Sequence, residues 1–162
     1  MTGVLLGKSR PLNAQTPLLA PILAGGLLAG VLDLAAAFAL AVSRGGTPER
    51  LLQAIASGFL GRAAYSGGMP AALLGLASHF TIALGAAAVF VLASRQLRWM
   101  SSQWLLVGPL YGMVVWTVMQ FIVLPLSAFP GGGAHTMKGV LTGLTVHIFC
   151  VGLPIAWAAR RW

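Results

Sequence analysis

The chain has 162 residues, of which 58% are hydrophobic and 7% are charged. In soluble domains about a quarter of the residues are charged. This composition therefore excludes an ordinary soluble domain and is typical of a membrane protein. A formal charge of +8 is also found in proteins that bind nucleic acid. However, the basic residues lie mostly at the edges of apolar runs, without the clustering of a phosphate-binding face, so no nucleic-acid partner is predicted. The single Cys150 excludes an internal disulfide and a cysteine-based metal cluster.

Four apolar segments are long enough to cross the hydrocarbon core of a bilayer, which is about 30 Å thick. Because every backbone amide in lipid needs an internal partner, each segment is predicted to be a helix. The predicted spans cover residues 18–42, 71–93, 104–126 and 140–159. The predicted fold is therefore an all-α membrane protein, a four-transmembrane-helix bundle over residues 18–162 that follows a tail of residues 1–17.

A short amphipathic helix is predicted over residues 48–63, between the first two spans. Thr47 is a typical N-cap, Pro48 suits the first helical position, and Glu49 places an acid in the first turn. Apolar residues then recur at helical spacing, opposite a polar side. The apolar side holds Leu51, Leu52, Ile55, Phe59 and Ala63, and the polar side holds Arg50, Gln53, Ser57 and Gly61. The pattern fits a helix lying in the membrane interface and equally a helix docked on the protein.

The distribution of basic residues predicts the orientation of the chain. If both chain ends lie on one side of the membrane, that side carries six of the ten Lys and Arg residues. The positive-inside rule then predicts cytoplasmic termini. Four tryptophans are expected at the same boundary as an aromatic belt: Trp99, Trp104, Trp157 and Trp162.

The sequence also contains signs of an internal duplication. Residues 75–79, Gly-Leu-Ala-Ser-His, match residues 143–147, Gly-Leu-Thr-Val-His. Gly26 and Gly30 of the first span likewise correspond to Gly108 and Gly112 of the third. Since spans one and three run in the same direction, the pattern predicts a 2+2 parallel repeat about an axis along the membrane normal.

Three apolar, glycine-rich segments carry a resemblance to a known family. They are residues 24–33, 55–61 and 150–155. With them the chain, after Pro17, resembles a family of small uncharacterised bacterial membrane proteins that are predicted to have four spans. The resemblance implies a location in the bacterial inner membrane and contributes no catalytic residue.

Each predicted span contributes one strongly polar residue at a similar depth. These residues are Asp33, His79, Gln120 and His147. At 1.5 Å per helical residue, all four lie about 9–14 Å below the non-cytoplasmic surface. A carboxylate within a bilayer costs about 2.5–3.5 kcal/mol, so these groups are predicted to face the bundle interior as a buried Asp/His polar centre, with Asp33 accepting a hydrogen bond from an imidazole.

The sequence leaves the role of this centre open. It suits a structural network in an interaction or assembly partner, which would dock a membrane protein or a second copy through its glycine faces. It also suits a proton or small-solute conduit with Asp33 and the histidines as proton sites. Alternatively, His79 and His147 fit the two axial ligands of a b-type haem, or ligands of another metal, in an electron-transfer protein. No hydrolase motif or Ser/His/Asp order is present, so enzyme activity is not favoured.

Overall fold

The computed structural model describes residues 18–131 and 136–162, so the predicted tail of residues 1–17 lies outside the described residues. Four helices are long and apolar enough to cross a membrane. They cover Leu19–Ser43, Gly68–Gln96, Trp104–Leu126 and Met137–Arg161. The predicted all-α four-helix bundle is therefore confirmed, with each span within about three residues of its predicted bounds.

The first two spans are continuous helices, α1 (Leu19–Ser43) and α3 (Gly68–Gln96). The last two each contain a π-helical segment. The third span is built from α5 (Trp104–Val118), η2 (Met119–Val123) and α6 (Leu124–Leu126). The fourth is built from α7 (Met137–Val146), η3 (His147–Gly152) and α8 (Leu153–Arg161). The short helix α4 (Trp99–Ser102) connects α3 to α5.

A proline follows each π-helical segment at the same distance. Pro125 lies two residues after the end of η2, and Pro154 lies two residues after the end of η3. A proline inside a helix has no N–H to donate and its ring clashes with the carbonyl four residues earlier. Widening of the preceding turn relieves that clash, which explains why both π-helices end where they do.

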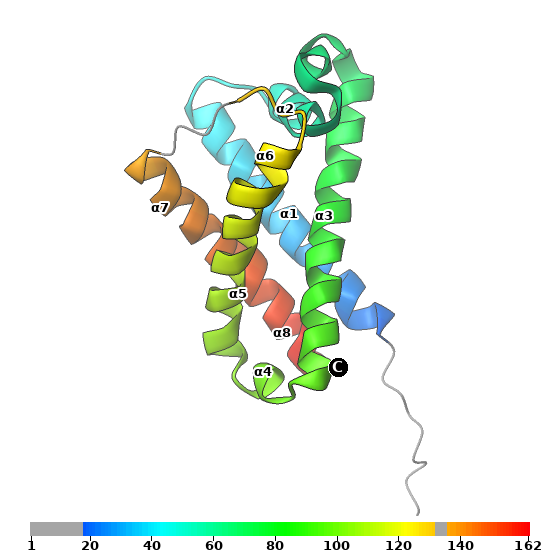
Figure 1. The fold of residues 1–162 in the computed structure, drawn as a ribbon, viewed down its shortest axis with the longest axis vertical. Helices are drawn as coiled ribbons and strands as arrows, with labels where there is room; N and C mark the ends of the chain where they lie inside the picture. The colour runs from blue at the N-terminus through cyan, green and yellow to red at the C-terminus, as the bar shows by residue number, and fades with distance from the viewer. Residues whose placement is uncertain (1–17, 132–135) are drawn as a thin grey trace, which may run out of the picture.

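The four spans cross rather than run parallel to one another. In Figure 1, α1 and the α7–α8 helix run diagonally behind the steeper α3 and α5. α1 packs on α3 and α8, while α5 packs on η3 and α8. Tyr111 joins α5 to α3, because its hydroxyl donates a 2.7 Å hydrogen bond to the Ala86 carbonyl and its ring meets Phe90 edge-on at 4.9 Å.

The glycine pairs of the first and third spans lie against equivalent positions of the second and fourth. The close contacts are Gly26–Leu84, Gly30–Phe80, Gly108–Gly152 and Gly112–Ile148. The 68-residue offset that aligns His79 with His147 also aligns Leu84 with Gly152 and Phe80 with Ile148. The two helix pairs thus have corresponding contacts, as a parallel duplication predicts, although Gly108 lies equally close to Ala156 and Gly112 lies closest to His147. These glycine faces are covered within the chain, so they are not open to a partner.

The amphipathic helix α2 (Pro48–Leu60) docks on α3 and is followed by the 3₁₀ helix η1 (Gly61–Ser66). Its buried residues are Gln53, Ala56 and Ser57, whereas Phe59 is 69% exposed. The Gln53 amide donates hydrogen bonds to the Glu49 carboxylate at 3.1 Å and to the Gly68 carbonyl at 3.3 Å. The helix thus docks through its polar side, while Leu51, Leu52 and Ile55 of its apolar side are half-buried.

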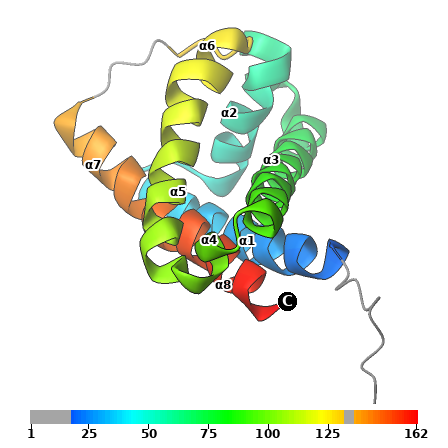
Figure 2. The ribbon, with the colours of Figure 1, turned by 60° about the horizontal axis from the view of Figure 1, so that its bottom comes forward.

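The core of the bundle lies between its middle and the α4 end. Its largest fully buried side chains include Phe90, Ile155 and Val91. Figure 2 shows α4, α8 and the start of α5 together at this end. There Arg160 lies 5.5 Å from the centre of the Trp104 ring and Arg161 lies 4.6 Å from that of Trp157. The expected belt of tryptophans and basic residues thus gathers at one end, while its cytoplasmic orientation stays a prediction.

Candidate functional site

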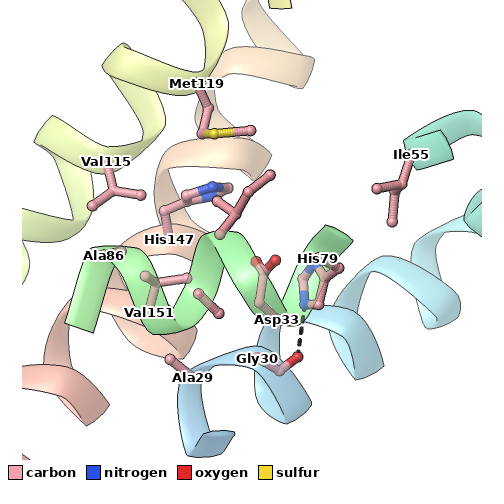
Figure 3. A pocket seen from close by; sticks show the side chains of 12 residues that line it. Ala29, Gly30, Asp33, Ile55, His79, Ala86, Val115, Met119, His147 and Val151 are labelled. Carbon is pink, nitrogen blue, oxygen red and sulfur yellow. Dashed lines mark hydrogen bonds between the residues drawn. The ribbon is translucent and has the colours of Figure 1, made fainter. Parts of the chain in front are cut away.

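A cavity of about 130 Å³ lies at the middle of the bundle, and three of the four predicted polar residues line it. Asp33 comes from α1, His79 from α3 and His147 from η3. Figure 3 shows the Asp33 carboxylate pointing into the space that the two imidazole rings flank. The structure therefore brings together residues that lie as far as 114 positions apart in the chain.

The prediction that this Asp/His centre is buried is wrong. Asp33, His79 and His147 are each half-buried. The physical reason is the small size of their neighbours, since much of the cavity wall is made by Ala29, Gly30 and other small residues. Small side chains leave space beside the polar groups, so the site stays accessible instead of being closed by packing.

Gln120 does not line this cavity. It is half-buried and lines a neighbouring groove, while Met119, one residue earlier, takes the position at the cavity. Successive residues of a helix point about 100° apart. The prediction for Gln120 used only its depth along the helix. Its side chain points in a different direction, toward the groove and not toward Asp33.

Both histidines donate hydrogen bonds to backbone carbonyls. His79 Nε2 lies 2.9 Å from the carbonyl oxygen of Gly30, and His147 Nδ1 lies 3.0 Å from that of Gly143 on its own helix. A carbonyl only accepts, so each of these nitrogens carries the proton. In a neutral imidazole the other nitrogen is then an acceptor, namely Nδ1 of His79 and Nε2 of His147.

The Asp33 carboxylate accepts no hydrogen bond from any described residue, so the predicted bond from an imidazole to Asp33 is absent. His79 instead reaches past Asp33 to the backbone of α1 (Figure 3). Cys150 of η3 also lies within electrostatic range of this carboxylate. A carboxylate and the unprotonated ring nitrogen of a neutral imidazole both accept hydrogen bonds, so these side chains offer acceptors to a ligand in the cavity.

The geometry does not fit axial ligation of a haem. Nε2 of His79 is occupied by the Gly30 carbonyl, and the cavity of about 130 Å³ is small for a macrocycle. Sites for drug-sized ligands take roughly 300–1,000 Å³. Among residues 18–131 and 136–162, no group of three or more His, Cys, Asp or Glu residues is arranged to hold a metal ion.

A second, larger hollow adjoins the cavity and was not predicted from the sequence. It is a groove of about 850 Å³ between α2, α3 and the η2–α6 segment. Ile55, Ile82 and Met119 line both the groove and the cavity. The groove therefore lies next to the cavity that holds the polar side chains. Its only signal in the sequence was the apolar side of α2, which faces it.

Toward the α4 end the cavity is closed by the apolar core. Phe90 and Ile155 are fully buried there, each four residues beyond a cavity residue of the same span, Ala86 or Val151. Tyr111 packs against this cluster and joins α3 to α5. The polar site is therefore open toward one end of the bundle and sealed toward the other.

Comparison with models of protein families, with curated proteins and with solved structures finds no match to this chain. The resemblance to the bacterial four-span family is neither supported nor contradicted by these comparisons. It stays a prediction, as do the inner-membrane location and the cytoplasmic termini. What the chain does must therefore be argued from the site itself.

Proposed function

We propose that this protein is a membrane conduit for protons or a small cation, and that Asp33 is the site at which the cation is loaded. The observation that carries the proposal is the chemistry of the cavity. Asp33, His79 and His147 come from three helices and offer a carboxylate and two imidazole lone pairs. A group of acceptors without internal donors is complementary to a proton or to a cation that donates hydrogen bonds.

The position of the site within the membrane supports the same function. An ionisable residue costs about 2.5–3.5 kcal/mol at the centre of a spanning helix, and such residues commonly mark ion pathways and proton relays. A structural role would offset that cost through hydrogen bonds to Asp33. None is formed within the described part of the chain, so the carboxylate remains available to a ligand.

The one-sided opening defines how the conduit works. A cation reaches Asp33 from the α2 end through the groove, and the core around Phe90 blocks its passage toward the α4 end. Transport then requires that the core layer opens while the groove closes. With the predicted cytoplasmic termini, loading takes place from the non-cytoplasmic side.

The alternative role as an interaction or assembly partner has less support. Its proposed docking faces, Gly26-x-x-x-Gly30 and Gly108-x-x-x-Gly112, are covered by α3 and by the fourth span. A membrane partner or a homo-oligomer that binds elsewhere stays a prediction.

Proton flux into liposomes tests the proposal. The full chain is reconstituted, a potassium diffusion potential is imposed, and internal pH is followed with a trapped dye. Wild-type protein should carry protons above the protein-free rate, and Asp33→Asn should return the flux to that rate. Asp33→Glu keeps the carboxylate and should retain part of the flux.

The matched control is Thr145→Val. Thr145 is exposed on α7, and its hydroxyl donates to the Leu141 carbonyl of the same helix, so this variant should leave the flux unchanged. Equal flux through wild type and Asp33→Asn would overturn the proposal, and so would a wild-type rate no higher than that of empty liposomes.

A further inference from the structure

We infer that the preferred ligand of this site is an amphiphilic amine, with its protonated amino group in the cavity and its hydrocarbon tail in the groove. The inference rests on the proposed function, because it names the class of cation that Asp33 binds. It is carried by two adjoining hollows that differ in chemistry, one acceptor-rich and one apolar.

The two hollows meet at three apolar side chains. Ile55 of α2, Ile82 of α3 and Met119 of η2 line both of them. A ligand whose head lies beside Asp33 would place its tail in the groove once these side chains move apart. Methionine is unbranched and flexible, so Met119 is suited to move aside for a tail.

The head group is defined by the polar atoms of the cavity. Asp33 and the free nitrogens of His79 and His147 all accept hydrogen bonds. A primary ammonium carries three N–H donors and one positive charge, which matches three acceptors and one carboxylate. Carboxylates, phosphates and carbonyl head groups bring only further acceptors or negative charge, so the same cavity disfavours them.

The tail is defined by the groove. Most of its lining is apolar and includes Leu51, Phe59, Ile122 and Leu126, of which Phe59 is 69% and Leu126 84% exposed. The walls are joined at the far end, where the Ala128 amide donates a 2.8 Å hydrogen bond to the Gly58 carbonyl of α2. This hydrogen bond fixes the two walls of the groove relative to each other. A ligand dissolved in the membrane enters it from the side.

Binding of a matched series of small probes to the purified full chain tests the inference. The probes are n-hexylammonium, n-hexanol, n-hexanoate and methylammonium, measured by equilibrium dialysis with radiolabel. Hexylammonium should bind at least about tenfold more tightly than methylammonium, since each additional buried CH₂ contributes to affinity. Hexanol and hexanoate should bind weakly because neither carries a positive charge.

The tail also concentrates hexylammonium in detergent, so a variant that fills the groove is needed. A Cβ on Gly58 would have only ordinary contacts, 3.7 Å to Ser127 Cβ and 3.8 Å to its Oγ. Gly58→Leu therefore fits the helix and occupies the groove. The matched control is Gly85→Leu, because a Cβ on Gly85 meets nothing within 4 Å and Gly85 lines neither hollow.

Gly58→Leu should weaken hexylammonium about tenfold and leave methylammonium unchanged, while Gly85→Leu should change neither. Asp33→Asn should weaken both amines by about tenfold or more, because the ammonium loses its charged partner. If Gly58→Leu and Gly85→Leu give the same hexylammonium affinity, the groove does not hold the tail and this inference fails, although the cation site stands. If Asp33→Asn binds methylammonium as wild type does, the proposed function itself fails.

Discussion

The two ends of this bundle differ in how tightly their side chains pack. Toward the α4 end, side chains such as Phe90 and Ile155 are fully buried and close the space between the helices. Toward the α2 end, small side chains and two π-helical segments border the cavity and the groove. The difference teaches that hydropathy determines where the helices run, while residue size and prolines determine which half of the membrane stays open.

The largest loss of stability should come from a substitution in the tightly packed core toward the α4 end. Phe90→Ala removes a side chain with no exposure and should lower the free energy of unfolding by about 3–5 kcal/mol. Phe59→Ala, on the outward side of α2, should change it by no more than about 0.5 kcal/mol. Unfolding in mixed micelles, followed by circular dichroism, gives both values. Similar losses for the two variants would contradict the contrast between the ends.

The next largest loss of stability should come from the close contact between Gly112 of the third span and Gly152 of the fourth. A Cβ on Gly152 would lie 2.6 Å from the backbone nitrogen of Gly112, so Gly152→Ala forces the third and fourth spans apart. Overpacking of this kind costs about 1–3 kcal/mol. Gly85→Ala, which faces open space, is the control and should be close to neutral. A Gly152→Ala protein as stable as wild type would show that this backbone contact is not formed.

The smallest loss of stability should come from the hydrogen bond that joins α5 to α3 between the two halves. Tyr111→Phe removes the hydroxyl that donates to Ala86 and should lower stability by about 0.5–1.5 kcal/mol. It should also raise hydrogen exchange on α3 near Ala86, measured by mass spectrometry. Tyr65→Phe is the control, because the Tyr65 hydroxyl donates no hydrogen bond to a described residue. Equal exchange in the two variants would show that Tyr111 does not join α3 to α5.

Much of the fold was predictable from the sequence, because helices in lipid must satisfy their own backbone and reveal themselves by length and apolar content. The pairing of the spans was also visible, since the repeated glycines Gly26 and Gly108 mark close contacts. Pro125 and Pro154 could have indicated the π-helical turns before them.

The site was predictable only in part. Counting residues placed Asp33, His79 and His147 at one level, and they do line one cavity. Depth says nothing about side-chain direction, so Gln120 was grouped with them although it lines the groove. Burial was also misjudged, because hydropathy does not report whether the neighbours on other helices are small or large. The docking of α2 through Gln53 could not be predicted for a similar reason. A polar helix side that binds backbone carbonyls has the same sequence pattern as one that faces water.

Asp33 is the only aspartate in the chain, which makes its carboxylate directly observable. Protein labelled with ¹³C at the aspartate side-chain carboxyl should give one resonance from this site. The account predicts that methylammonium shifts this resonance in a saturable way, whereas sodium hexanoate at equal ionic strength does not. A resonance that is unmoved by methylammonium in folded protein would contradict the claim that Asp33 is an accessible cation site.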